Sequence, residues 1–478
     1  MATLSATDNV GIEANQRGDL PPLGKDPSFL GMTATQFLGA FNDNLFKQMV
    51  LLICIDVVRA GGSDWQGLAQ AIFAVPFILF SGFAGWLSDR TPKRGLVVLC
   101  KVAEIAIMAA GMIAFFVGNL RPEVLLIYLF IVLALMSSQS AFFGPAKYGI
   151  LPELFRDRDL PAANGWIQMT TFLAIIFGTA LAGFGKQMLG TNLWVISAIC
   201  VVIAMVGTAT SLVIRKTPVA QPGLALKPSS LILDSSLWDV LLRDRKLLGV
   251  LLITSLFWMI GGLVPVTVNA FGKLQLGLND TRTSIMAACM GVGIAIGCVL
   301  AGRLSQGRLR FGLVTIGAWG LIATFLVATA IGHYGTADIA PAELQAAQEN
   351  PFAAKAFELD NPAQWPAYVT MIALGGFAGL FAVPLQVFLQ HRPPRELKGR
   401  MIGAMNLVNW IGIFLSAALY GLLAAIWGDS REYAWIFAVA AAMLLPVALF
   451  YRPKNESLDE PGERGAGRGG DGGQEMEN

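Results

Sequence analysis

The chain has 478 residues, of which 55% are hydrophobic and 14% are charged, whereas an ordinary soluble domain has about 25% charged residues. The 34 basic and 32 acidic residues give a formal net charge of only +2, so no global field suggests nucleic-acid binding. This composition excludes a soluble enzyme and a disordered scaffold, and it indicates a protein that crosses a membrane many times.

The two ends of the chain differ from the rest. Residues 1–27 are polar and acidic, so they lack the basic start and apolar core of a signal peptide. Residues 453–478 are rich in glycine and charge and cannot bury enough apolar surface to fold alone. We expect both segments to be disordered tails.

Between these tails, twelve apolar runs approach or exceed the length of about 20 residues that spans a bilayer as a helix. The first six lie near residues 28–58, 65–88, 95–117, 123–143, 162–185 and 192–214. The second six lie near residues 246–271, 281–303, 311–332, 367–390, 399–426 and 431–451. The sequence therefore predicts an all-α membrane protein of two six-helix bundles, at 28–215 and 246–452, joined by a cytoplasmic linker at 216–245.

Basic residues are distributed unequally between the loops on the two sides. The loops after the second, fourth, sixth, eighth and tenth spans hold 19 lysines and arginines, and the loops on the other side hold seven. Cytoplasmic loops of membrane proteins are enriched in these residues. We expect a multi-pass protein of the cytoplasmic (inner) membrane with both termini in the cytoplasm.

The two halves resemble each other in sequence. The segment from Gly85 to Val97 aligns with the segment from Gly302 to Val314 at an offset of 217, and Gly183 matches Gly421 at an offset of 238. Repeats of this kind recur in transporters whose bundles rock about a central cavity. The pattern predicts transport by alternating access.

Polar and charged residues inside the spans are functional candidates, because a charge in hydrocarbon costs about 2.5 kcal/mol or more. They concentrate in the N-terminal half, with Asp43 and Lys47 in the first span, Glu104 in the third and Lys147 just beyond Pro145. Our candidates for substrate binding and translocation are Asn42, Asp43, Asn44, Lys47, Glu104, Lys147, Asn164 and Gln168.

Two other interpretations of these charges remain open. Asp43 and Lys47 are four residues apart on one helix face, so they can simply neutralise each other. Lys101 precedes Glu104 by one turn and can reach the cytoplasmic interface by snorkelling. The five cysteines and two histidines have no metal-ligand spacing, so we expect no metal, no cofactor and no enzymatic activity.

The segment from Gly85 to Arg94 has the G-x-x-x-D-R pattern followed by further basic residues. It resembles the loop motif between the second and third spans of the major facilitator superfamily, with Pro92 where that motif usually has glycine. The resemblance implies a conformational latch formed by Gly85, Asp89, Arg90 and Arg94, in which Asp89 meets a helix N-terminus of the other bundle. The alternative is that these charges only set the topology.

Four further segments resemble the bacterial lysophospholipid transporters of that superfamily, including the transporter modules of acyltransferase fusions. They are Gln36–Lys47, Phe143–Glu153, Ser255–Trp258 and Gly375–Gln386. The resemblance implies a monomeric protein that moves a membrane lipid, chiefly lysophosphatidylethanolamine, from the outer to the inner leaflet. A separate acyltransferase is then a possible partner.

The chain departs from these transporters at three places. Gln168 replaces a glutamate, Pro265 stands where they have a basic residue, and the segment Asn406–Asn409 lacks their acidic residue. Two other functions therefore remain open. One is a major facilitator exporter or symporter of a small polar or amphipathic solute, and the other is a non-transporting membrane partner of an acyltransferase.

Overall fold

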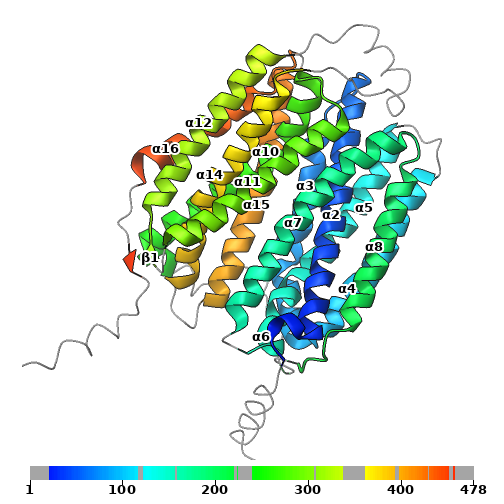
Figure 1. Cartoon of the computed structure of the whole chain (residues 1–478), viewed down its shortest axis with the longest axis vertical. Coiled ribbons are helices and arrows are strands. Elements are labelled where there is room, and N and C mark those ends of the chain that lie inside the picture. Colours follow the sequence, from blue (N-terminus) through cyan, green and yellow to red (C-terminus); the bar gives the residue numbers. More distant parts are fainter. Residues whose placement is uncertain are drawn as a thin grey trace, which may run out of the picture.

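The computed structural model describes residues 21–116, 122–156, 159–219, 223, 240–305, 308–336, 361–392, 398–428, 430–451 and 456–457. Helices account for nearly all of these residues, which form two side-by-side groups of long helices (Figure 1). The predicted all-α class and the two bundles of six helices are confirmed.

The N-terminal bundle consists of α2 (Pro27–Arg59), α3 (Gln66–Arg90), α4 (Lys93–Phe116), α5 (Pro122–Gly149), α7 (Leu160–Leu189) and α8 (Trp194–Leu212). The C-terminal bundle consists of α10 (Arg245–Ala270), α11 (Asp280–Ser305), α12 (Gly312–Gly335), α14 (Gln364–His391), α15 (Lys398–Trp427) and α16 (Trp435–Phe450). The short elements are η1 (Leu23–Lys25), α6 (Leu151–Leu154), η4 (Phe271–Gln275) and the paired strands β1 (Arg308–Leu309) and β2 (Glu456–Ser457).

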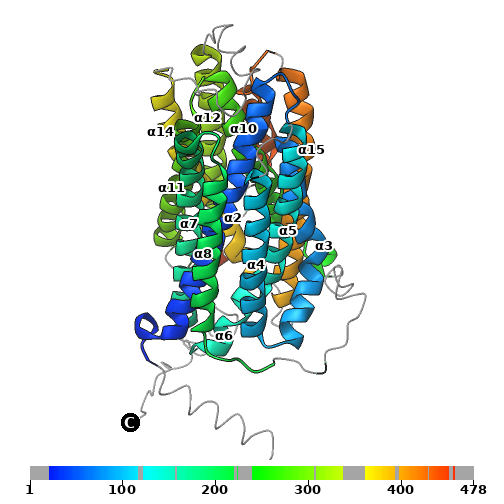
Figure 2. The same cartoon turned by 90° about the vertical axis from the view of Figure 1, so that its right-hand side faces the viewer.

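The long helices run roughly parallel to one axis (Figure 2). We call the end where α2 begins and α16 ends the terminal face, which is the lower end in both views, and the other end the opposite face. Eleven helices of the described chain are long and apolar enough to cross a membrane. The twelfth, α16, has 16 residues, or about 24 Å at a rise of 1.5 Å per residue.

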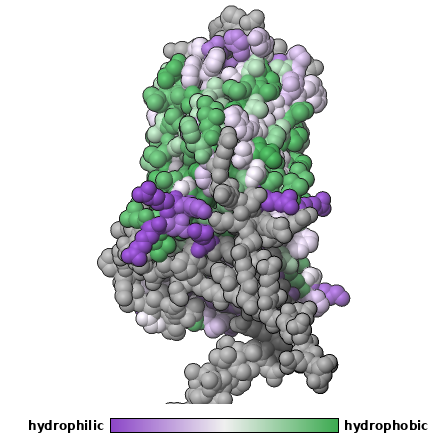
Figure 3. All heavy atoms as spheres, turned by 90° about the vertical axis from the view of Figure 1, so that its left-hand side faces the viewer, coloured by the Kyte–Doolittle hydropathy of each residue, from purple (hydrophilic) through white to green (hydrophobic). Residues whose placement is uncertain are grey.

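The outer surface of the C-terminal bundle carries a broad apolar zone with polar residues above and below it (Figure 3). Large apolar side chains are exposed on the outside of both bundles, such as Phe116 at 71% and Phe450 at 83%. A soluble monomer rarely exposes so much contiguous apolar surface. The chain is therefore a multi-pass membrane protein.

Polar contacts fix the helix ends at the terminal face. Asp26 caps α2 by accepting a hydrogen bond from the Ser28 amide at 2.8 Å, and it pairs with Arg215 at 2.9 Å. Residues 21–27, which the sequence placed in the tail, thus belong to the N-terminal bundle. The remaining tail residues 1–20 and most of the linker and of 453–478 lie outside the described residues.

Asp244 has the same role at the start of α10. It accepts hydrogen bonds from the Lys246 and Leu247 amides and pairs with Arg392 at 2.9 Å. Burial alone would raise the pKa of Asp244, but these hydrogen bonds and the Arg392 charge outweigh it, so the pKa lies below its usual value. The N-terminus of α10 is thereby tied to the C-terminus of α14.

The packing pattern repeats between the halves. In the first bundle α2 packs on α7 and α3 packs on α5, and in the second bundle α10 packs on α15 and α11 packs on α14. The bundles meet along two seams, α7 against α11 and α3 against α15. In the sequence repeat, α7 corresponds to α15 and α11 corresponds to α3. The two seams are therefore related by the pseudo-symmetry between the bundles.

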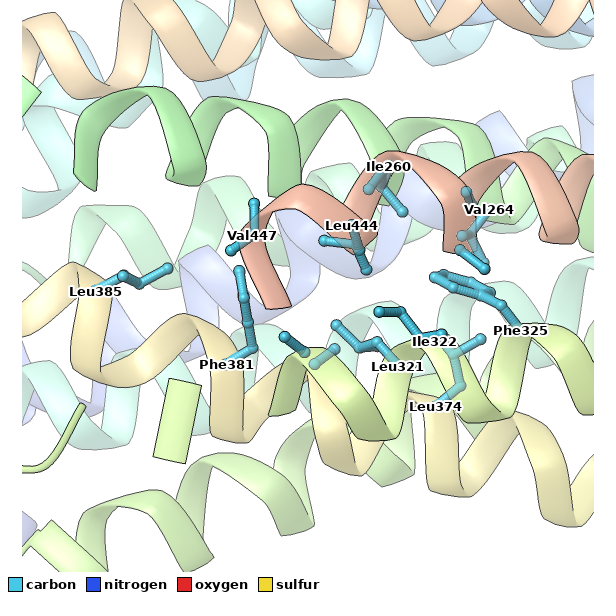
Figure 4. Close-up of a cluster of buried hydrophobic side chains, with 14 of the residues drawn as sticks. Ile260, Val264, Leu321, Ile322, Phe325, Leu374, Phe381, Leu385, Leu444 and Val447 are labelled. Atoms are coloured by element: carbon cyan, nitrogen blue, oxygen red, sulfur yellow. The ribbon is translucent and has the colours of Figure 1, made fainter. Parts of the chain in front are cut away.

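The C-terminal bundle has a tightly packed apolar core. Buried side chains from α10, α12, α14 and α16 face one another in this core (Figure 4), among them Val264, Phe325, Phe381 and Leu444.

Candidate functional site: a two-sided central cavity

A cavity of about 2010 Å³ lies between the bundles. Its lining includes Gly85 and Tyr148 near the terminal ends of α3 and α5, Asn164 near the start of α7, and Asn406 near the start of α15. Residues at the terminal ends of both bundles thus line it, together with Gly223 of the segment after α8. The cavity is therefore open toward the terminal face.

The two walls of the cavity differ in polarity. The polar side chains of the N-terminal bundle that line it are Asn44, Lys47, Gln48, Ser81, Ser140, Tyr148, Asn164, Gln168, Thr171 and Thr179. The wall from the C-terminal bundle is made mainly of aliphatic, aromatic and small residues, with Gln386 and Asn406 as its polar exceptions apart from tryptophan and cysteine. A ligand in this cavity meets a polar surface on one side and an apolar surface on the other.

A group of four buried charges closes the opposite face at the α7–α11 side. Asp56 of α2 and Lys186 of α7 come from one bundle, and Lys273 of η4 and Asp280 of α11 come from the other. Lys186 Nζ lies 2.8 Å from Asp280 Oδ2, and Lys273 Nζ lies 2.6 Å from Asp56 Oδ1. Lys186 also pairs with Asp56, and Lys273 with Asp280. We call these four residues the charge tetrad.

The tetrad is neutral as a set and has almost no contact with solvent, since its side chains are 0–7% exposed. Arg59 adds a hydrogen bond from Nη2 to the carbonyl of Lys273 at 2.8 Å. Nearby, Gln48 donates from α2 to Asn269 Oδ1 of α10 at 2.8 Å. Ion pairs and hydrogen bonds therefore join the bundles above the deep end of the cavity.

The α3–α15 side is closed by neutral and acidic partners. Tyr420 donates to Asp64 Oδ2 at 2.5 Å, and Gln66 Nε2 donates to the Tyr420 hydroxyl at 2.8 Å. Burial raises the pKa of Asp64 above its ordinary value, although hydrogen bonds from Tyr420 and Gln66 act to lower it. Both seams are thus closed at the opposite face.

Aromatic rings close the inner end of the cavity between α3 and α15. Phe77 and Trp410 stack with ring centroids 3.8 Å apart and planes within 5°. Lys47 Nζ lies 4.2 Å from the centroid of the Phe73 ring, a cation–π distance. Lys47, Phe77 and Trp410 all line the cavity.

Four predicted site residues line the cavity, namely Asn44, Lys47, Asn164 and Gln168. The Asn44 side chain donates to the Ala40 carbonyl at 2.7 Å, and Gln168 accepts a long hydrogen bond of 3.4 Å from Tyr148. Lys47 makes no ion pair in the described part of the chain. The interpretation that Lys47 and Asp43 neutralise each other is therefore wrong.

Asp43 lies behind the cavity wall. Its Oδ2 accepts a hydrogen bond from Ser140 at 2.6 Å, and its Oδ1 is buried without a hydrogen-bond partner among the described residues. Lys147 is half-buried with Nζ 4.6 Å from the Tyr148 ring, and it lies within electrostatic range of Asp43. Neither Asp43 nor Lys147 is part of the cavity lining.

Glu104 and Asn42 lie inside the N-terminal bundle, away from the cavity. Glu104 is 1% exposed and pairs with Lys101, while Asn42 donates to Glu104 Oε1 at 2.9 Å. The expectation that Lys101 snorkels to the interface is wrong, because Lys101 is also 1% exposed. Gly39 and Gly207 leave the space that its side chain occupies.

Among the described residues, the contacts of the predicted latch residues stay within the N-terminal bundle. Asp89 lies 3.8 Å from Lys93 of its own bundle, Arg90 stacks on Trp86, and Arg94 donates to the carbonyl of Leu212 at 2.9 Å. Gly85 lines the cavity. The cavity is open at the terminal face, which is consistent with Asp89 pairing with Lys93 of its own bundle.

Sequence reasoning missed the charge tetrad. Asp56 directly follows the apolar run Met49–Ile55, which was a usable signal for an intramembrane charge. Lys186 and Lys273 are two of the seven basic residues assigned above to the loops of this side, and nothing in the sequence shows that they are buried. The described residues contain no cluster of His, Cys, Asp and Glu that could hold a metal ion.

The model of the Major Facilitator Superfamily matches residues 32–342 and 352–470, which is most of the chain. The chain belongs to the major facilitator superfamily. Within this superfamily, it is similar to a protein of Enterobacter sp. (strain 638) named lysophospholipid transporter LplT, with 28% identity over 404 residues, covering 82% of this chain and 88% of the relative. The LplT of Photorhabdus laumondii is 26% identical over 396 residues, covering 82% and 87%.

Solved structures of two transporters share the fold. A D-xylose-proton symporter superposes with a TM-score of 0.63 at 15% identity, covering 89% of this chain and 98% of that chain. The nucleoside transporter NupG (D323A mutant) gives a TM-score of 0.61 at 13% identity, covering 87% and 98%. These likenesses establish the two-bundle architecture of a transporter fold for this chain.

Proposed function

We propose that this protein is a secondary-type transporter that moves lysophospholipids across the membrane by alternating access. The observation that carries the proposal is the two-sided cavity, whose N-terminal wall is polar and whose C-terminal wall is apolar. A lysophospholipid has a polar head and one acyl chain, so its two parts match the two walls. The LplT relatives, which resemble the chain over both bundles, support the same substrate class.

The size of the cavity favours a lipid over a small solute. Sites for small ligands have volumes of about 300–1,000 Å³, whereas this cavity is about 2010 Å³. The apolar wall includes Phe257, Trp258, Ile294 and Val383, whose side chains are not buried. A small polar solute would leave this wall exposed to water, while an acyl chain would cover it at a gain of about 25 cal/mol per Å².

The basic loops support one orientation in the membrane. Their excess on the terminal face favours a cytoplasmic position for that face and for both termini. Three of the few basic residues at the opposite face are also engaged there, since Arg59, Lys186 and Lys273 hold the bundles together. The state described is then inward-open in the cytoplasmic membrane, and the direction of movement is from the outer to the inner leaflet, where a separate acyltransferase can use the product.

The experiment measures uptake of labelled lysophospholipids by spheroplasts that lack their own lysophospholipid transporter. The test variant is Gly261→Phe, because Gly261 lines the cavity with free space around its Cα and a phenyl ring there would occupy the acyl path. The matched control is Gly249→Phe on the same helix, outside the cavity lining and also with free space.

Saturable uptake by the wild type and the control, lost in Gly261→Phe at equal membrane abundance, is the expected result. If the correctly inserted wild type accumulates no lysophospholipid of any head group, the proposal is overturned. Small polar or amphipathic solutes would then be screened with the same pair of variants.

A further inference from the structure

Lys47 is the one formally charged side chain among the described residues that line the cavity. It projects from the middle of α2, below the hydrogen bond that Gln48 makes across the bundles. Its Nζ rests on the Phe73 ring at 4.2 Å and has no carboxylate partner in the described part of the chain. The deep end of the cavity thus holds an uncompensated positive charge.

The carboxylates of the membrane spans have partners outside the cavity. Glu104 is paired with Lys101 inside the N-terminal bundle, and Asp56 and Asp280 belong to the charge tetrad. Asp43 is covered by Ser140, and its free oxygen has no solvent contact. No described carboxylate therefore reaches the cavity to bind an ammonium group.

Lys147 does not add a second positive charge to the cavity. It lies outside the lining, beside its own neighbour Tyr148. Lys47 is therefore the one described cation that faces the cavity. An anion that contacts Lys47 would form a charge-assisted hydrogen bond with it.

We infer that Lys47 is the head-group determinant of this transporter and that the cavity selects lysophospholipids whose head group carries net negative charge. The inference rests on the proposed function. The phosphate binds Lys47, and the acyl chain lies on the wall of the C-terminal bundle. A zwitterionic head group brings an ammonium for which the lining offers only amide, hydroxyl and aromatic groups, so part of its hydration is lost without a partner.

The experiment uses the purified full chain in proteoliposomes and compares two labelled substrates with the same acyl chain. Lysophosphatidylglycerol carries one net negative charge, and lysophosphatidylethanolamine carries none. We expect a lower KM for the glycerol lipid in the wild type. In Lys47→Met the KM of both lipids should rise by about ten-fold, because each phosphate loses one hydrogen bond to a charged group. The preference for the glycerol lipid should also fall, because the ammonium of the ethanolamine lipid no longer meets a like charge.

Two further variants make the result specific. Lys47→Arg keeps the positive charge and should keep the preference. Lys216→Met removes a charge from an exposed position beyond α8, outside the cavity, and should leave the preference unchanged. Lys47→Met should leave the melting temperature close to that of the wild type, because Lys47 makes no ion pair in the described part of the chain, so a folding defect is not expected.

The outcomes separate the inference from the function on which it rests. If both lipids are transported with equal KM, or if Lys47→Met leaves the ratio unchanged, the inference is overturned and the proposed function stands. If the folded wild type transports neither lipid, both are overturned.

Discussion

Lys186 at the end of α7 and Asp280 at the start of α11 join the two bundles through a buried ion pair, with Nζ 2.8 Å from Oδ2. Asp56 and Lys273 complete a square in which each cation contacts both anions. Two of these four ion pairs, Lys186–Asp280 and Asp56–Lys273, cross the interface between the bundles. Opening the opposite face therefore requires that two ion pairs be separated and rehydrated together.

The charge tetrad gives a prediction about charge balance. Asp280→Asn or Lys186→Met alone leaves one uncompensated buried charge, which costs about 3–5 kcal/mol. The double variant Lys186→Met/Asp280→Asn retains the balanced pair Asp56–Lys273. We expect each single variant to have a clearly lower melting temperature in detergent than the wild type, and the double variant to recover most of the loss.

The same variants should shift the conformational equilibrium. Spin labels at the opposite-face ends of α7 and α11 should report longer distances in the single variants than in the wild type. Single and double variants that lose stability to the same extent would show that the four charges do not act as a balanced set.

The repeat identified in the sequence, Gly183 with Gly421, lies on the two seams. A Cβ added at Gly183 would overlap the Asp280 carbonyl and the Ser284 side chain across the α7–α11 seam. Across the α3–α15 seam, a Cβ added at Gly67 would lie 3.6 Å from the amide nitrogen of Gly421. Gly183→Ala should prevent full closure of the opposite face and so favour the state that is open there. The measurement is the rate at which a thiol reagent modifies a cysteine placed at that face. We expect this rate to be higher in Gly183→Ala than in the wild type.

Gly249→Ala is the control for this experiment, since its Cβ would meet no other atom within 4 Å. Equal modification rates in Gly183→Ala, Gly249→Ala and the wild type would mean that the seam tolerates the added methyl group and does not set the equilibrium.

The helices were predictable because each span needs only a local apolar run, and the observed bounds of α2, α3 and α4 lie within two residues of the expected ones. Contacts between residues that are far apart in the sequence were not predictable in this way. Asp56 and Lys273 are 217 residues apart, and no local pattern indicates that they meet. The same holds for the site, where composition identified Lys47 and Asp43 as candidates but could not show that only Lys47 faces the cavity.

Asp64 makes the α3–α15 seam sensitive to pH. An exposed aspartate has a pKa of about 3.9, and burial raises the pKa of Asp64 above this in the closed state. The closed state therefore binds a proton at Asp64 more tightly than the open state does. Protonation stabilises the closed seam fully at a pH below the ordinary pKa, and this stabilisation is lost as the pH rises through the raised pKa. Lowering the pH from about 7 to about 4 should favour closure of this seam.

The measurement is the distance between spin labels at Ser63 and Ser430, which are exposed at the opposite-face ends of α3 and α15. Asp64→Asn should abolish the pH response. Asp244→Asn is the control, because hydrogen bonds lower the pKa of Asp244 and it lies at the terminal face; its response should match the wild type. A pH response that persists in Asp64→Asn would assign the effect to another group.

Substitution of Glu104 tests whether this residue stabilises the N-terminal bundle or binds the substrate. Because Glu104 is 1% exposed, pairs with Lys101 and lies outside the cavity lining, Glu104→Gln should destabilise the protein by about 3–5 kcal/mol, the cost of an unpaired buried charge. The KM of the folded fraction should stay close to that of the wild type. The double variant Lys101→Met/Glu104→Gln removes both charges and should regain much of the stability. Thermal denaturation measures the predicted loss of stability, and uptake kinetics measure the predicted KM. A large rise in the KM of Glu104→Gln at normal stability would show that Glu104 contributes to substrate binding.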